Sequence, residues 1–64
     1  MDNYKFIKYE SIYSPDIVLY ALEKNAVKKE IDGVIFIEVT PNFKEVRVVR
    51  LDSLKPIGST IVGF

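Results

Sequence analysis

Apolar residues recur along the chain at spacings that predict at least three strands. Residues 4–9 mix aromatic and β-branched residues with alternating lysines, as in a short, half-exposed strand. Residues 34–40 and 45–51 are two further β-branched runs. The Pro-Asn-Phe-Lys segment between them, residues 41–44, has the length and chemistry of a hairpin loop. We therefore expect an N-terminal strand and a later hairpin.

A helix is predicted from Pro15 to about Ile31. Ser14 suits a helix N-cap, Pro15 the first helical position and Asp16 the positive end of the helix dipole. The segment is rich in good helix formers and has no internal glycine or proline. Gly33 can adopt the left-handed conformation that ends a helix. If the first two strands are sheet neighbours, this helical crossover makes them parallel.

The segment after Leu51 leaves alternatives open. Residues 52–55 fit one helical turn capped by Asp52, and residues 60–62 fit a last short strand. The order of a strand, the turn Leu51-Asp52-Ser53-Leu54 and a closing strand is similar to the end of small SH3-like barrels. The similarity covers about a fifth of the chain and includes no diagnostic residue, so it implies neither a fold nor a function.

The expected fold class is α+β. We expect residues 1–64 to form a single domain with a small single-layer sheet and one helix, in the order β-α-β-β, with a fourth, C-terminal strand as an open alternative. A chain of this length buries only about 60% of the surface that its unfolded form exposes. A well-packed core or a partner chain must compensate, because the chain has no cysteine and no histidine for a disulfide or a common zinc site.

The predicted elements carry apolar side chains on two sides. With an even-length hairpin loop, Ile37 faces Val48 and Phe36 faces Val49, and both faces of the hairpin are apolar. The predicted helix shows two apolar stripes, although a helix buried on one side shows one. Either the remaining segments close a barrel-like core, or one surface binds a partner. The candidate interface residues are Ile17, Tyr20, Val27, Ile31, Val34, Phe36, Val49, Leu51 and, at the loop tip, Phe43.

Charge balance argues against a general affinity for polyanions. Nine Lys and Arg residues are matched by nine Asp and Glu, so the net charge is zero. Aromatic rings near basic residues keep nucleic-acid binding as the alternative function, although the interleaved acids favour solvated strand edges. The candidate nucleic-acid contacts are Lys5, Lys8, Lys44, Arg47, Arg50 and Lys55.

Candidate catalytic chemistry is scarce. The absence of His and Cys excludes the usual activated nucleophiles, and no spacing supports a Ser/Lys dyad at Ser14, Ser53 or Ser59. The acids are scattered singly and the three glycines stand alone, so we expect no metal, no cofactor and no enzyme activity.

The expected function is that of a small accessory or interaction protein. We expect it to act through protein–protein contacts with itself, as a homodimer, or with another protein. The start of the sequence lacks the pattern of a signal peptide, and no apolar run reaches the roughly 20 residues that span a bilayer. We therefore expect no membrane partner and a cytoplasmic location.

Overall fold

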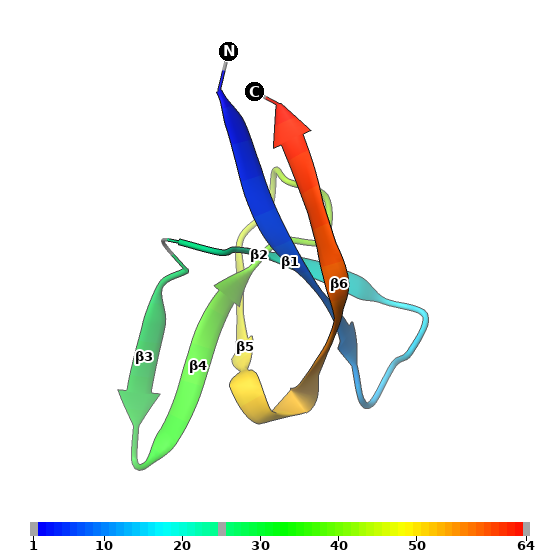
Figure 1. The fold of residues 1–64 in the computed structure, drawn as a ribbon. Helices are drawn as coiled ribbons and strands as arrows, with labels where there is room; N and C mark the ends of the chain where they lie inside the picture. Colours follow the sequence, from blue (N-terminus) through cyan, green and yellow to red (C-terminus); the bar gives the residue numbers. More distant parts are fainter. Residues whose placement is uncertain (1, 25, 64) are drawn as a thin grey trace.

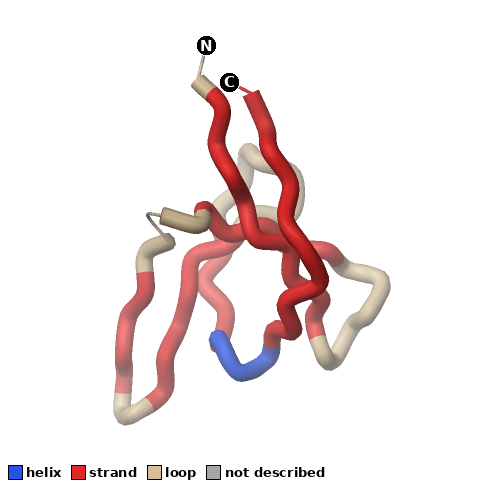
Figure 2. Tube along the Cα trace, viewed as in Figure 1, coloured by secondary structure: helices blue, strands red, loops and turns tan. Residues whose placement is uncertain are grey.

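The chain folds almost entirely into β-strands (Figures 1 and 2). The structure is a computed structural model that describes residues 2–24 and 26–63. Its strands form two antiparallel three-stranded sheets with the orders β2-β1-β6 and β3-β4-β5. The expected α+β class is therefore wrong. In chain order the elements are β1 (Asn3–Ser11), β2 (Val18–Leu22), β3 (Lys28–Ile31), β4 (Val34–Val39), β5 (Arg47–Arg50), the 3-10 turn η1 (Leu51–Ser53) and β6 (Leu54–Gly63).

Strands β2 and β3 occupy the segment for which a helix was predicted. Leu19 and Ala21 are buried while the alternate residues of β2 are half-buried, which is the period-2 pattern of a strand. The Ser-Pro-Asp signal belongs to a β-turn, in which the Ile17 N–H donates to the Ser14 carbonyl at 3.0 Å. Consequently the predicted strands of residues 4–9 and 34–40 are not parallel neighbours: β1 and β4 lie in different sheets, and β1 pairs with β2 in an antiparallel manner. Asn25, which the predicted helix included, lies outside the described residues.

Gly33 shapes a hairpin turn instead of ending a helix. Asp32 and Gly33 have φ values of 52° and 79°, and the flanking residues Ile31 and Val34 are paired. Positive φ at both central residues is the mark of a two-residue type I′ turn, whose backbone twist suits an antiparallel hairpin. The Asp-Gly pair therefore makes a β3–β4 hairpin.

The predicted β4–β5 hairpin is present, but its register is shifted by one residue. Ile37 pairs with Val49 and Glu38 with Val48, so the predicted partners Ile37–Val48 and Phe36–Val49 are wrong. The connection runs over residues 40–46, an odd length where an even one was expected. Because side chains alternate between faces, this shift exchanges the face of every β5 residue relative to β4.

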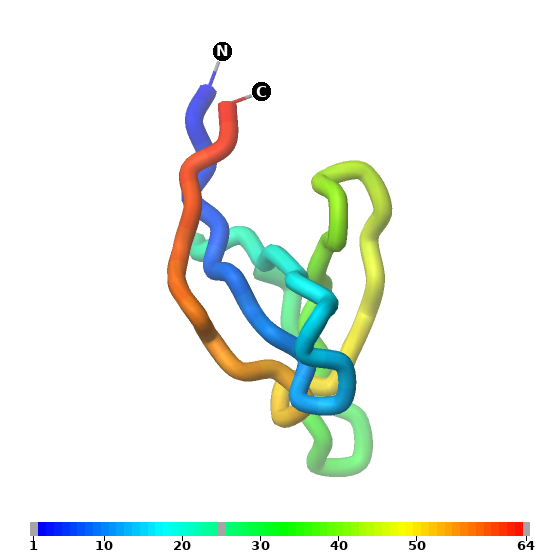
Figure 3. Tube along the Cα trace, turned by 90° about the vertical axis from the view of Figure 1, so that its right-hand side faces the viewer, coloured from blue at the N-terminus to red at the C-terminus, as the bar shows by residue number. Residues whose placement is uncertain are grey.

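The core lies between the two sheets. Figure 3 shows β1 and β6 on one side and β4 and β5 on the other. Ile37 and Val39 of β4 are each 2% exposed and pack with Leu19 and Ala21 of β2 and Leu54 of β6. Tyr20 and Thr40 join the sheets through backbone hydrogen bonds of 2.9 and 2.8 Å.

The C-terminal segment is a full strand. β6 begins at Leu54 and runs antiparallel to β1 to the Asn3–Gly63 pair, with a bulge opposite Lys8 and Tyr9. It is longer than the last strand predicted over residues 60–62, and the turn η1 before it starts one residue earlier than expected. The N-terminal end of β1 and the C-terminal end of β6 project together from the body of the domain (Figure 1).

Candidate interaction surface

The β3-β4-β5 sheet has one face against the core and one face away from it. Ile37 and Val39 point into the core, so the alternate residues of β4 point outward. Val48 and Arg50 of β5 are the cross-strand partners of Glu38 and Phe36, so their side chains also point outward. We define the outer face as Val27, Lys29, Ile31, Val34, Phe36, Glu38, Val48 and Arg50.

The outer face exposes apolar side chains on two strands and the segment beside them. Ile31 and Val48 are 55% and 56% exposed. Val27, just before β3, is 47% exposed and is held beside Glu38 by a 3.0 Å bond from the Glu38 N–H to its carbonyl. Phe36 is half-buried in the central strand. An apolar surface that spans a sheet in this way is typical of a protein contact site.

An aromatic cluster adjoins the outer face at the junction between the sheets. The ring of Phe43 lies 4.5 Å from that of Tyr20 and meets that of Phe6 edge-on at 5.1 Å, measured between centroids. Phe43 reaches them because its backbone adopts a left-handed φ of 66°. The Asn42 Oδ1 shapes the loop by accepting hydrogen bonds from the N–H groups of Lys44 and Glu45. The loop thus folds back, and Phe43 helps to keep Phe6 buried.

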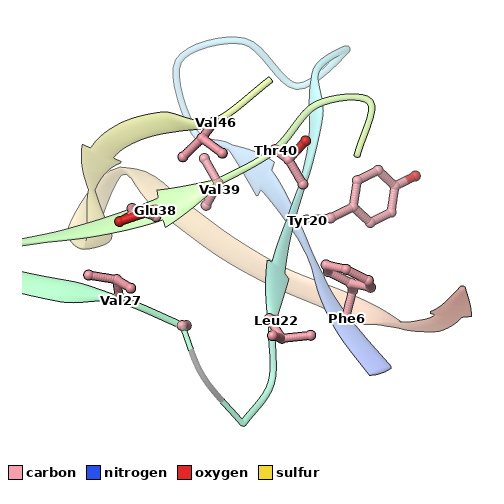
Figure 4. A pocket seen from close by; sticks show the side chains of 9 residues that line it. Phe6, Tyr20, Leu22, Val27, Glu38, Val39, Thr40 and Val46 are labelled. Carbon is pink, nitrogen blue, oxygen red and sulfur yellow. The ribbon is translucent and has the colours of Figure 1, made fainter. Parts of the chain in front are cut away.

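A shallow cleft of about 140 Å³ joins the aromatic cluster to the outer face. Figure 4 shows the rings of Phe6 and Tyr20 at one end of the cleft and Val27 and Glu38 at the other. The buried Thr40 hydroxyl oxygen has no hydrogen-bond partner among the described residues. The cleft is lined by Phe6, Tyr20, Leu22, Ala26, Val27, Glu38, Val39, Thr40 and Val46.

Charges on the outer face lie around Phe36. Lys29 of β3 and Arg50 of β5 flank it as cross-strand partners, and Glu38 follows it along β4. Arg50 is already paired with Asp52 through bonds of 2.8 and 3.1 Å, and this hydrogen bonding and attraction raise the pKa of its guanidinium. The ion pairs between described residues are Lys5–Glu23, Arg47–Glu45 and Arg50–Asp52. Lys29 and Glu38 take part in none of them.

The chain matches no known protein family, and its described residues form neither a metal site nor a membrane-spanning helix. No curated protein or solved structure matches the chain either. Within residues 2–24 and 26–63, no three acidic, cysteine or histidine residues gather closely enough to hold a metal ion. The described residues form no helix with the length and apolar character to cross a bilayer.

The residues predicted for an interface fall into three groups. Val27, Ile31, Val34 and Phe36 share the outer face, and Tyr20 and Phe43 form the adjoining cluster. The other three lie elsewhere. Val49 and Leu51 pack against the core, and Ile17 ends the loop between β1 and β2.

The six basic residues named for nucleic-acid binding are dispersed. Lys5, Arg47 and Arg50 are each paired with an acid. Lys8 lies in β1, Lys55 is the cross-strand neighbour of Glu10 in the β1–β6 ladder, and Lys44 lies in the loop of residues 40–46. Their positions on both sheets do not form one basic face.

Two of the three serines weighed for a Ser/Lys dyad, Ser53 and Ser14, have structural roles. The Ser53 hydroxyl donates to the Arg50 carbonyl at 2.7 Å, and Asp52 holds the Arg50 guanidinium. Ser14 is part of the turn before β2. Glu38 is half-buried on the outer face and has no ion-pair partner among the described residues.

Lys29, Glu38 and Val48 belong to the candidate surface but were not predicted from the sequence as part of it. Val48 was expected opposite Ile37, on the other face of the hairpin from Phe36. An odd loop length would have placed it beside Glu38, which is the register that the structure has. The Asp32-Gly33 turn signal would have placed Lys29 in a strand.

Proposed function

We propose that this chain is a small interaction protein that acts through protein–protein contacts and associates with itself through the outer face. The observation that carries the proposal is the exposure of Val27, Ile31 and Val48 on one continuous face around Phe36. Burial of such side chains in a contact releases about 25 cal/mol per Å² of apolar surface removed from water. The outer face thus offers a driving force for association.

The small core gives the domain a reason to use a partner. Among the described residues the buried apolar side chains are Phe6, Leu19, Ala21, Ile37, Val39 and Leu54. Domains below about 70 residues rarely obtain more than about 3 to 5 kcal/mol from one core. A second copy on the outer face would cover Phe36 completely and extend the apolar packing to both sides of the β3-β4-β5 sheet.

The size of the outer face sets the strength of the contact. The three strands have four, six and four residues, which span roughly 200 to 250 Å² of sheet. Specific stable interfaces bury about 800 Å² of accessible surface per partner, so this contact lies at the small end. We therefore expect a dissociation constant in the micromolar range or weaker, which corresponds to about 8 kcal/mol or less.

Sedimentation equilibrium tests the proposal. The wild-type chain, measured from about 1 µM to 1 mM, should associate reversibly over this range. Val48→Lys places a charge in the centre of the contact and should leave the chain monomeric. Ile61→Lys is the matched control, because Ile61 is 68% exposed on β6, outside the outer face, and its replacement should not change association.

Two results would contradict the proposal. A wild-type chain that stays folded and monomeric at 1 mM would remove self-association. Loss of association in Ile61→Lys together with an unchanged Val48→Lys would place the contact on β6 instead of the outer face. Circular dichroism on each variant establishes that a monomeric chain is still folded.

A further inference from the structure

Two unpaired, opposite charges lie on the outer face. Glu38 is half-buried between Val27 and Val48, its neighbours on the adjacent segments, and has no cation within ion-pair distance among the described residues. Lys29 is exposed on β3 beside Phe36, one pair further along the sheet, and has no acidic partner there either. Because neither charge is paired within the described part of the chain, each is available to an opposite charge on a partner.

The positions of these charges distinguish two ways of packing two outer faces together. Cross-strand partners such as Lys29, Phe36 and Arg50 form rows across the sheet. With the two-fold axis along the strands, each row of one copy lies over the same row of the other, so Glu38 meets Glu38 and Lys29 meets Arg50. Both contacts bring like charges together, which disfavours this arrangement. With the axis across the strands, midway between Phe36 and Glu38, the order of rows is reversed in the second copy.

This reversed arrangement brings opposite charges together. Glu38 of one copy then lies over Phe36 of the other, whose cross-strand neighbours are Lys29 and Arg50. Lys29 of the second copy is offset from Glu38 of the first by one strand, about 4.8 Å, and the two sheets lie about 10 Å apart. The Glu38 and Lys29 side chains together span this separation. Arg50 contributes less, because Asp52 already neutralises it.

We infer that the partner on the outer face is a second copy packed with its strands reversed, held in this orientation by Glu38 of each copy against Lys29 of the other. The inference rests on the proposed function and adds the orientation and the residues that select it. Face-to-face sheets pack with their strands within about 30° of each other, which this arrangement allows. The symmetry forms the Glu38–Lys29 contact twice in each dimer.

Charge reversal with rescue tests the inference. Lys29→Glu and Glu38→Lys each replace attraction by repulsion at both contacts, and each should raise the dimer dissociation constant about tenfold or more. An equimolar mixture of the two variants places opposite charges together again. It should associate more tightly than either variant alone, and native mass spectrometry should show the heterodimer in excess over both homodimers.

Off-face variants separate the local contact from the change in net charge. Lys24→Glu and Asp16→Lys change the net charge by the same amounts as Lys29→Glu and Glu38→Lys but lie in loops away from the outer face. Alone and mixed, they should associate as the wild type does. Rescue in the first mixture also shows that both of its members fold, and Glu38→Gln, which only removes the charge, should weaken association less than Glu38→Lys.

The outcomes distinguish the inference from the proposed function. If Val48→Lys is monomeric while Lys29→Glu, Glu38→Lys and their mixture all associate like the wild type, the surface is correct and the orientation is wrong. If the off-face mixture shows the same preference for heterodimers, general charge attraction explains it and the inference is overturned. If the wild type is monomeric, both fall.

Discussion

Replacement of Phe43 by alanine would remove the ring that closes the aromatic cluster. Phe43 comes from the loop of residues 40–46 and contacts Tyr20 of β2 and Phe6 of β1. The substitution leaves both strands without this cover. Because the ring bridges a loop and the β2-β1-β6 sheet, its loss should affect global stability as well as the loop.

The structure gives the size of the expected effect. Complete burial of a Phe side chain contributes about 1.5 to 3 kcal/mol, of which about half applies to the half-buried Phe43. Each of the two ring pairs adds about 0.5 to 1.5 kcal/mol. We therefore expect Phe43→Ala to lower the free energy of unfolding by about 2 to 4 kcal/mol, a large part of what a core of this size supplies.

Two further substitutions separate the ring from the backbone. The φ of 66° costs a non-glycine residue about 1 to 2 kcal/mol, and glycine does not incur this cost. Phe43→Gly should therefore be more stable than Phe43→Ala by about 0.5 to 1 kcal/mol, although glycine is the less stable residue at an ordinary position. Phe43→Leu keeps apolar cover without the ring pairs and should lie between alanine and the wild type.

Urea unfolding followed by far-ultraviolet circular dichroism measures these differences. The near-ultraviolet tyrosine signal gives a local reading, because Tyr20 loses its neighbouring ring in all three variants. A Phe43→Ala domain within about 0.5 kcal/mol of the wild type, the usual range for exposed surface positions, would show that the ring contacts do not stabilise the fold. If Phe43→Gly were less stable than Phe43→Ala, the left-handed backbone would be refuted.

Other positions give smaller or simpler tests by the same unfolding measurement. Gly33→Ala should cost about 1 to 2 kcal/mol from backbone strain alone, because nothing lies within 4 Å of the added methyl group, and an unchanged midpoint would contradict the type I′ turn. Ile37→Ala removes a core side chain that is 2% exposed and should cost about 2 to 5 kcal/mol, enough to leave the domain largely unfolded by circular dichroism; a fully folded variant would contradict the position of the core. Asn42→Ala removes an acceptor of two backbone N–H groups and should cost about 1 kcal/mol, less than Phe43→Ala; an equal or larger cost would mean that the loop depends on Asn42 more than on the ring.

Local chemistry predicted half of the strands but failed where helical and strand periodicities overlap. Runs of β-branched and aromatic residues correctly predicted β1, β4 and β5. Between Pro15 and Ile31, helix-forming residues outweighed a β-branched minority, and the contacts of Leu19 and Ala21 with the opposite sheet decide the outcome. The two opposed apolar stripes of the predicted helix already indicated a strand, since alternation along a strand such as β2 also places apolar residues on two sides.

The candidate surface could be predicted only in part, because its composition depends on register. The apolar character of residues 34–40 on both faces was visible in the sequence. Which face turns inward depends on the length of the loop up to Arg47, and that length follows from the ring contacts of Phe43 with residues distant in sequence. Val49 was consequently expected on an interface and lies against the core, whereas Val48 lies on the outer face.

The pairing of β1 with β6 bears on how the chain folds. The β3–β4 hairpin, closed by Asp32 and Gly33, needs only local contacts and can form early. The contact between Asn3 and Gly63 brings opposite ends of the chain together, and it forms only after the loop-closure entropy of nearly the whole chain is lost. We expect the β1–β6 ladder to complete late, so that during folding the longest strands of the domain are also the last to lose their open edges.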